Sequence, residues 1–239
     1  MSKQRWRLEN LDAVELLESF EDECIDLIIT DVAYESLEKH RKLGTTTRLK
    51  HSKSSSNDWF QIFPNSRFPK LFEELYRVLK NNTHCYFYCD QETMFVAKPI
   101  AEAAGFKFWK PIVWDKMYNG MGYHYRARYE FILFFEKGKR KLRSLSIPNV
   151  LEVPRVRGGY PTEKPIALNA ILIEQSSEPG ELVLDPFMGS GSVGAASLGL
   201  SRLFFGNDLS RNAVDTAKKL LLETAKEVAC CGVPEMSAG

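Results

Sequence analysis

Acidic residues end two neighbouring apolar runs in the stretch 181–209, which reads ELVLDPFMGSGSVGAASLGLSRLFFGNDL. Asp185 follows the first run, Asp208 follows the second, and glycines that include Gly189 and Gly191 lie between them. Glycines let a ligand approach the backbone closely, and a helix that begins after them offers free N–H groups. A carboxylate at the position of Asp208 can accept both hydroxyls of a ribose. The pattern therefore predicts a strand, a glycine turn, a helix and a second strand that together bind a nucleoside.

The charge of this turn indicates which nucleoside it would bind. Residues 189–194 match the pattern G-x-G-x-x-G, but such matches often occur by chance, with glycines that serve only packing. Asp185 would face a dinucleotide pyrophosphate at close range, where like charges repel each other. An acidic turn suits a positively charged cofactor instead. We therefore predict S-adenosylmethionine, which has a sulfonium and an ammonium group.

Apolar runs and turn residues predict the elements that must position these acids. We expect strands at 24–30, 84–89, 106–114, 129–136, 182–184 and 203–205. We expect helices at 12–18, 67–80, 93–104, 166–175, 193–200 and 211–228, with Asn81-Asn82 ending the second helix and Ser210 capping the last. The first strand stops at Asp31, and the polar segment 35–57 that follows is typical of a functional loop. No repeat or clear linker interrupts the chain, so we expect one domain over 1–239.

Composition narrows the class of protein. The chain has 239 residues, of which 44% are hydrophobic and 26% charged, as expected for a soluble globular α/β domain. Its five cysteines include no C-x-x-C pair, which favours reduced thiols over a disulfide framework or a metal site. The apolar runs are too short to span a membrane, and no signal-peptide pattern opens the chain. We therefore expect a cytoplasmic protein with no bound metal and no membrane partner.

The distribution of basic residues is more informative than the net charge, which is only +1. One stretch without acidic residues contains Lys39, Arg41, Lys42, Arg48, Lys50 and Lys53. A second stretch contains Arg126, Arg128, Lys137, Lys139, Arg140, Lys141 and Arg143, together with Glu130 and Glu136. Most charged runs are solvated faces, but two basic stretches on a near-neutral chain favour a nucleic-acid surface.

Four segments occur in a fixed order along the chain: a strand followed by DVAY, then RVLKNNTHCYFYCD, PTEKP and LVLDPFMGSGS. This order resembles the amino-group DNA methyltransferases of the permuted (beta) type. The resemblance implies an α/β, Rossmann-like methyltransferase fold. Its sheet would have about seven mainly parallel strands, one antiparallel strand and helices on both faces. It also implies S-adenosylmethionine as cofactor, double-stranded DNA as substrate, and pairing of two copies of the chain.

The resemblance also assigns cofactor-binding residues. Those near the methionine and ribose would be Asp185, Phe187, Gly189, Gly191 and Ser192, with Asp208 on the ribose hydroxyls. Thr162 and Lys164 of PTEKP would close over the methionine end, and Asp12 would lie near the adenine ring. Simpler interpretations stay open for two of these: Lys164 as an ordinary lysine before a helix, and Asp12 as a helix N-cap.

The catalytic tetrapeptide departs from the family pattern, because Val32 and Ala33 replace the usual two prolines after Asp31. The resemblance assigns three groups to the chemistry. The carboxylate of Asp31 and the carbonyl of Val32 would accept the two N–H bonds of the target amine, aiming its lone pair at the methyl group. Tyr34 would stack on the base, which must leave the duplex to be reached. Each replaced proline would cost about 0.4–1 kcal/mol through unfolded-state entropy, too little to abolish activity.

We therefore expect methyl transfer to N6 of adenine. Cytosine N4, or a catalytically idle DNA-binding relative, is the alternative. An Asp at the first position of the tetrapeptide leans towards adenine. DNA contacts are expected from loops at about 35–57 and 115–157, through Lys39, Arg41, Arg48, Lys50, Arg126 and Arg128.

Overall fold

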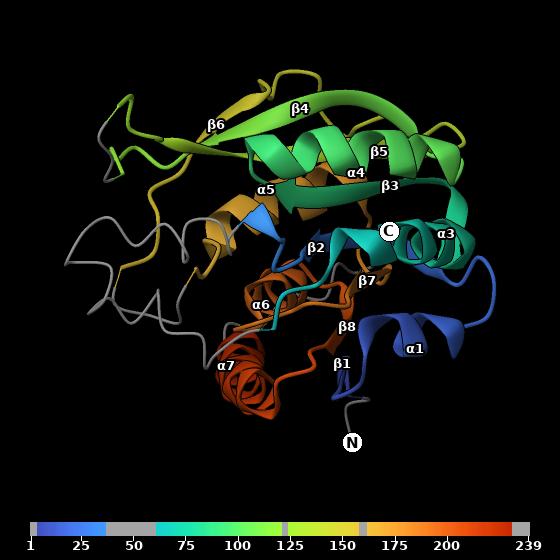
Figure 1. The fold of residues 1–239 in the computed structure, drawn as a ribbon. Helices are drawn as coiled ribbons and strands as arrows, with labels where there is room; N and C mark the ends of the chain where they lie inside the picture. Colours follow the sequence, from blue (N-terminus) through green and yellow to red (C-terminus); the bar gives the residue numbers. More distant parts are fainter. Residues whose placement is uncertain (1–3, 37–60, 121–123, 158–161, 231–239) are drawn as a thin grey trace.

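The computed structural model describes residues 4–36, 61–120, 124–157 and 162–230, which form one central sheet covered by helices (Figure 1). Within these residues the sheet has eight strands in the order β1-β8-β7-β2-β3-β5-β4-β6. The strands are β1 (Trp6–Glu9), β2 (Ile25–Asp31), β3 (Leu79–Cys89), β4 (Lys107–Asp115), β5 (Tyr129–Lys137), β6 (Val150–Glu152), β7 (Leu182–Asp185) and β8 (Leu203–Asn207).

Strand β5 alone runs against the others in this sheet, because it pairs antiparallel with both β3 and β4 while the remaining pairs are parallel. The predicted Rossmann-like fold with one antiparallel strand is therefore confirmed, but the expected number of seven strands is wrong. Six of the eight strands correspond to the apolar runs of the sequence, and the short strands β1 and β6, of four and three residues, are added at the two edges of the sheet.

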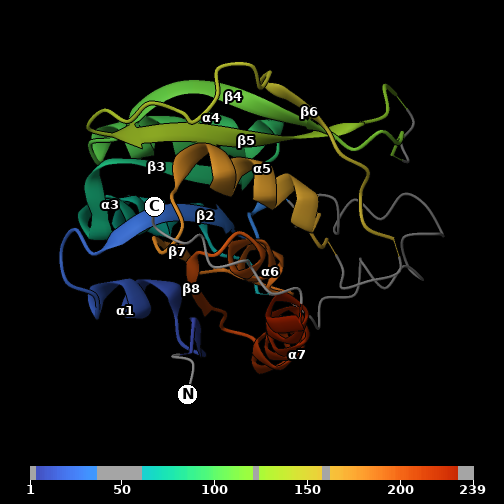
Figure 2. The same cartoon turned by 180° about the vertical axis from the view of Figure 1, so that it is seen from behind.

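Helices cover both faces of the sheet, as Figures 1 and 2 show from opposite sides. The helices are α1 (Ala13–Glu18), α3 (Phe68–Val78), α4 (Gln91–Ala103), α5 (Ile166–Ser176), α6 (Ser192–Gly199) and α7 (Arg211–Cys230), with a 3-10 turn η3 at Asn65–Arg67. Buried side chains of α1, α3 and α4 belong to one core cluster, and those of α5, α6 and α7 belong to the other. No helix among the described residues is long and apolar enough to cross a membrane.

Central strands read as continuous apolar runs because they are buried on both faces. In β2, Ile28 packs into the core with α1, α3 and α4, whereas Leu27 and Ile29 pack into the core with α5, α6 and α7. Asp31 is the last residue of this strand and the only one of its seven that is half-buried rather than buried.

The boundary between α3 and β3 differs from the sequence prediction. The helix ends at Val78, and the residues expected to finish and terminate it, at 79–82, belong to β3. The strand begins early because Leu79 pairs with Ile25 of β2 and Lys80 forms an ion pair of 2.7 Å with Asp26. Tertiary pairing therefore overrides the helical pattern of the sequence.

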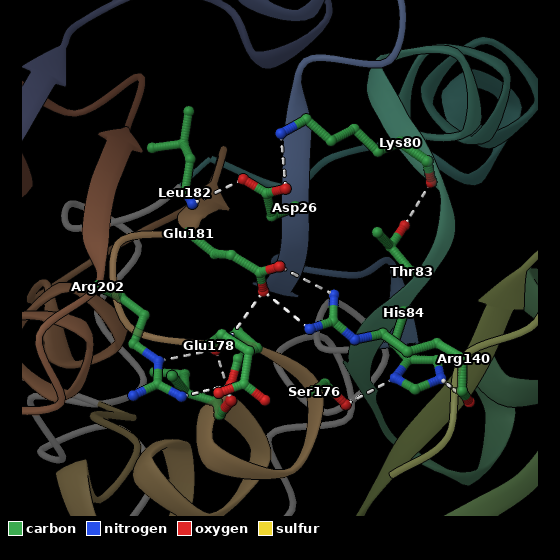
Figure 3. Close-up of polar contacts among 12 residues, drawn as sticks. Asp26, Lys80, Thr83, His84, Arg140, Ser176, Glu178, Glu181, Leu182 and Arg202 are labelled. Atoms are coloured by element: carbon green, nitrogen blue, oxygen red, sulfur yellow. Dashed lines mark hydrogen bonds and ion pairs between the residues drawn. The ribbon is translucent and has the colours of Figure 1, made fainter. Parts of the chain in front are cut away.

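Polar contacts join the amino ends of the strands (Figure 3). Asp26 accepts hydrogen bonds from Lys80 of β3 at 2.7 Å and from the backbone N–H of Leu182 of β7 at 2.9 Å. His84 lies buried with its Nδ1 2.8 Å from Ser176 Oγ of α5, and burial lowers the pKa of this histidine to about 4. These contacts fix the amino ends of the strands, and the candidate site lies at their carboxyl ends.

Candidate active site

A cavity of about 660 Å³ lies at the carboxyl ends of β2, β7 and β8. Strand β2 lies between β7 and β3. From β2 the chain continues to β3 on one side, and from β7 it continues to β8 on the other side, so the order of strands reverses here. Crevices at such switch points are where open α/β sheets bind ligands. Of the residues predicted from the sequence, the cavity is lined by Asp12, Asp31, Val32, Tyr34, Thr162, Lys164, Asp185, Phe187, Gly189, Ser192 and Asp208.

Asp208 is held by the glycine turn that precedes it in the chain. Its Oδ2 accepts the backbone N–H of Gly189 at 3.0 Å, and its Oδ1 accepts the backbone N–H of Ser210 at 2.8 Å. Burial raises the pKa of Asp208, and these two hydrogen bonds oppose the rise. Each carboxylate oxygen keeps a further lone pair, so the oriented group can accept two hydroxyls from a ligand in the cavity.

Gly191 has a different environment from Gly189, although both have a positive φ, of 85° and 52°. Gly191 is the N-cap of α6, and a Cβ added to it would lie 2.8 Å from the Cβ of Ala217 in α7. Gly191 is not among the residues that line the cavity, whereas Gly189 is. The close approach at Gly191 is therefore made to a helix of the protein.

Asp185 ends β7 and is buried at the base of the cavity. Its Oδ1 accepts the backbone N–H of Phe187 at 3.1 Å. Burial raises the pKa of Asp185 well above its ordinary value, although the N–H of Phe187 opposes the rise. The ring of Phe187 meets Phe63 edge-on, with ring centroids 5.2 Å apart. A buried carboxylate beside aromatic rings favours a ligand that brings positive charge.

A buried hydrogen-bond chain supports the start of α6. Asn169 of α5 donates from Nδ2 to Ser192 Oγ at 3.1 Å and accepts at Oδ1 from the hydroxyl of Tyr88 at 2.8 Å. Tyr88 and Ser192 both line the cavity. Strand β3 and helices α5 and α6 are therefore fixed to one another along the cavity wall.

Asp12 is the N-cap of α1, because its Oδ1 accepts the backbone N–H of Val14 at 2.9 Å. Arg67 donates to both of its carboxylate oxygens, at 2.8 and 2.7 Å, and lowers the pKa of Asp12. The same guanidinium lies 4.7 Å from the centre of the Phe63 ring. The N-cap interpretation is thus confirmed, and a contact between Asp12 and an adenine ring stays a prediction.

The tetrapeptide 31–34, DVAY, leads from the last residue of β2 into the cavity. Val32 is 1% exposed and Tyr34 is 8% exposed, and both line the cavity. The carbonyl of Ala33 accepts the backbone N–H of Phe63 at 2.8 Å. Burial raises the pKa of Tyr34 well above its ordinary value, so its hydroxyl stays neutral. The turn is therefore held by packing and by a backbone hydrogen bond.

Lys164 contacts Asp31, and no spacing in the sequence predicted this. Its Nζ forms an ion pair with Asp31 Oδ2 and lies 3.5 Å from Glu130 Oε2. Burial disfavours the ammonium, but the two carboxylates raise the pKa of Lys164. Thr162, two residues earlier, has a φ of 60° and is exposed at the rim of the cavity.

Glu130 is a site residue that the sequence patterns did not indicate. It lies in β5, accepts from Lys116 Nζ at 2.5 Å, and lines the cavity. Burial raises the pKa of Glu130, but Lys164 and Lys116 outweigh burial and lower it. The available signal was an acidic residue directly before the apolar run Phe131–Phe135, since such a residue needs a partner when buried.

The basic residues that bear on DNA contact divide into three groups. Lys39, Arg41, Arg48 and Lys50 lie outside the described residues. Arg128 forms an ion pair with Asp115 at 2.6 Å, and Arg126 is exposed. A third group lies in the predicted loop 115–157, although its residues were not assigned individually: the guanidinium groups of Arg155 and Arg157 lie 4.6 and 5.2 Å from the centre of the Tyr118 ring. These three residues follow β6 and β4, at the carboxyl edge.

Among the described residues, no group of three histidine, cysteine or acidic side chains could hold a metal ion. Cys24, Cys85, Cys89 and Cys230 are free thiols.

Comparison with known proteins gives a consistent result. The family model described as DNA methylase (N6_N4_Mtase) matches residues 25–150 and 142–219. The type II methyltransferase M.HpaI of Haemophilus parainfluenzae is 28% identical over 243 residues, which cover 90% of this chain and 74% of that protein. The crystal structure of M1.HpyAVI matches with a TM-score of 0.67 at 22% identity, covering 90% of this chain and 98% of that one. The cytosine-N4-specific PvuII DNA methyltransferase matches with a TM-score of 0.69 at 15% identity, covering 95% and 93%.

Proposed function

This chain belongs to the DNA methylase family described by that model, and we propose that it transfers a methyl group from S-adenosylmethionine to an exocyclic amine in double-stranded DNA. One observation supports the proposal above the others. Three carboxylates, Asp31, Asp185 and Asp208, stand at or just after the carboxyl ends of neighbouring strands and line one cavity. Asp185 and Asp208 suit a cationic nucleoside, and Asp31 suits an amine that donates hydrogen bonds.

The residues present fit S-adenosylmethionine. Asp208 offers two oriented oxygens to ribose hydroxyls, and Asp185 offers a buried negative charge that a nearby cation would stabilise. A structure of M1.HpyAVI was solved as its SAM complex, and it matches this chain with a TM-score of 0.64 at 21% identity. Gly189, Ser192, Phe187 and Thr162 line the same cavity and would contact the cofactor.

When bound, the cofactor supplies an electrophilic methyl group on a sulfonium. The residues of the chain would do the rest. Asp31 and the carbonyl of Val32 would accept the two N–H bonds of the target amine, whose lone pair is otherwise conjugated with the ring. Asp31 would then stabilise the positive charge that develops on the nitrogen, which returns to neutrality by releasing one proton to water. Tyr34, held in the cavity wall, would stack on the base.

We propose N6 of adenine as the methylated position, because Asp31 rather than a serine leads the tetrapeptide. Cytosine N4 is the alternative within the same chemistry. The loops at about 35–57 and 115–157 would bind DNA, and Arg155 and Arg157, which follow β6, add basic groups that lie against Tyr118. We also propose that the chain works as one methyltransferase domain over 1–239.

The test is transfer of tritium from methyl-labelled S-adenosylmethionine to DNA, followed by digestion and separation of nucleosides. Label in N6-methyldeoxyadenosine supports the proposal, and label in N4-methyldeoxycytidine changes the base but keeps the chemistry. Asp31→Ala is the control, and it should lose at least about 10²-fold in rate, a typical effect of removing one preorganised electrostatic partner. No label above this control, with the cofactor bound, would identify an idle DNA-binding relative.

A further inference from the structure

Four side chains of alternating charge meet beside the proposed catalytic turn. Lys164 Nζ pairs with Asp31 Oδ2 and lies 3.5 Å from Glu130 Oε2, while Lys116 Nζ lies 2.5 Å from Glu130 Oε1. Asp31 ends β2, Glu130 is in β5, Lys116 follows β4, and Lys164 precedes α5. Segments distant in the chain therefore meet to form one ion-pair cluster at the carboxyl edge.

The stability of the fold does not by itself explain a lysine at position 164. Its side chain is only 9% exposed, and Asp31 and Glu130 are 27% and 21% exposed. Replacing a buried ion pair by well-packed apolar residues is often neutral or stabilising, because burial of charge is unfavourable. A cluster of charges beside Asp31 suggests instead that the ammonium acts on this carboxylate.

We propose that Lys164 is a positioning residue for methyl transfer: its ammonium keeps Asp31 ionised and oriented, and Glu130 holds that ammonium in place. The inference rests on the proposed function, because the ionisation of Asp31 matters to a reaction only if Asp31 accepts a hydrogen bond from the target amine. An ionised carboxylate accepts both the hydrogen bond and the developing positive charge, whereas a protonated carboxyl opposes them.

The surroundings of Asp31 explain why it needs the ammonium. Burial raises the pKa of Asp31, Lys164 opposes the rise, and the charge of Glu130 adds to it. The titratable groups that act electrostatically on Asp31, or on which it acts, are Lys164, Lys116, Glu130, Asp185, Tyr34, Tyr88 and Cys89. Lys164 is the cation in direct contact with it, so its removal should leave the carboxyl protonated at higher pH.

The first experiment measures the rate of methyl transfer against pH in the full chain, at saturating cofactor and DNA, so that titration of Asp185 in the cofactor site does not enter. We expect Lys164→Met to move the acid limb of the profile up by about one pH unit or more. Glu130→Gln should lower the rate, because the Lys164 ammonium loses the carboxylate that holds it in place. It should not move the limb upward, because it also removes a negative charge near Asp31. The two variants are thus expected to differ in the direction of the shift.

Lys98→Met is the matched control, because Lys98 is a partly exposed lysine of α4 that pairs with Glu102 at 2.7 Å, away from the cavity. It should leave both the rate and the limb unchanged. Affinity for S-adenosylmethionine, measured by calorimetry, should change by less than about threefold in Lys164→Met. A large loss of affinity with an unmoved limb would assign Lys164 to the cofactor and overturn the proposal.

A second readout does not depend on activity. The pKa of Asp31 is followed by ¹³C NMR of carboxyl-labelled aspartate, with Asp31→Asn used to assign the signal. It should rise in Lys164→Met, and rise less in the double variant Lys164→Met plus Glu130→Gln, which also removes the unpaired carboxylate that could prevent folding. If the wild type transfers no methyl group but this shift occurs, the proposed function fails and the electrostatic coupling stands. If the wild type is active and the Asp31 signal titrates identically in all variants, the inference is wrong.

Discussion

Replacing Gly191 by alanine should destabilise the protein without changing the cofactor cavity, whereas the same change at Gly189 should act inside that cavity. Gly191 has a φ of 85°, and an added Cβ would lie 2.8 Å from the Cβ and 3.0 Å from the Cα of Ala217. Gly189 lines the cavity and donates its N–H to Asp208 at 3.0 Å. The two glycines of one turn therefore have separable roles.

The expected loss of stability follows from two contributions. A left-handed backbone costs a residue with a Cβ about 1–2 kcal/mol. Forcing a methyl group into a packed interface costs about 1–3 kcal/mol. The smaller entropy of the unfolded alanine chain offsets about 0.4–1 kcal/mol. The net loss in Gly191→Ala is then about 1–4.6 kcal/mol, which corresponds to a fall in Tm of roughly 2–18 °C for a protein of this size.

Urea unfolding and calorimetry with S-adenosylmethionine, both on purified full chains, test this reasoning. The folded Gly191→Ala protein should bind the cofactor with wild-type affinity, and Gly189→Ala should bind it more weakly. Adding Ala217→Gly should recover part of the stability, with a coupling energy of about 1 kcal/mol, because it removes the opposing methyl group. A stable Gly191→Ala protein that no longer binds the cofactor would refute the packing argument. It would instead support the cofactor contact that the sequence resemblance assigns to Gly191.

Three further predictions concern the carboxylates and the basic surface. Asp208→Ala should weaken S-adenosylmethionine binding by at least about 10-fold in calorimetry, because even one hydrogen bond to a charged group contributes about 1.5–3 kcal/mol. Asp185→Asn should raise the Tm of the cofactor-free protein at pH 7, with the difference closing as the pH falls towards 4. Burial raises the pKa of Asp185 in the folded state, so its stabilising contribution is present below its unfolded pKa and is lost as the pH rises through the folded pKa. Arg155→Ala plus Arg157→Ala should weaken binding to all DNA sequences, and the slope of log affinity against log salt should fall by roughly 0.9 for each phosphate that these arginines neutralise in the wild type.

Each of these changes has a control and a contrary outcome. Asp208→Asn keeps the shape of the side chain and should lose less affinity than alanine; equal affinity in all three proteins would remove the ribose assignment. A Tm difference for Asp185→Asn that does not change with pH would show that its ionisation is irrelevant. For the arginines, the control is Lys107→Ala plus Lys139→Ala. It removes the same charge where β4 begins and β5 ends, and both lysines are exposed there. An equal loss in that control would mean that net charge alone governs DNA binding.

The sequence predicted the central strands well because they are buried on both faces. The apolar runs at 24–30 and 182–184 correspond to β2 and β7, and the acid after each run ends the strand. Edge strands β1 and β6 are different, since four and three residues are too few to show a period. Their pairing with β8 and β4 comes from the assembled sheet.

The role of a site residue could be predicted from the sequence where it depends on neighbouring residues. It could not be predicted where it depends on contact with a residue far away in the chain. Asp12 could be predicted as an N-cap from its neighbours. Its bidentate partner Arg67 is 55 residues away, and Lys164 is 133 residues from Asp31, so no spacing in the sequence relates these pairs. Glu130 was predicted only as a diluting charge in a basic stretch. The structure makes it the partner of two lysines.

The turn after Asp31 shows how the missing prolines are replaced. Proline would limit the freedom of the unfolded chain, whereas contacts in the folded state have to hold Val32 and Ala33 in place. Val32 is buried in the core cluster, and the carbonyl of Ala33 accepts the backbone N–H of Phe63 at 2.8 Å. The ring of Phe63 in turn meets Phe187, in the turn that we propose to bind the cofactor. The geometry of the catalytic turn therefore depends on the segment at Phe63 and on the cofactor side of the cavity, a dependence that a proline-fixed turn would not need.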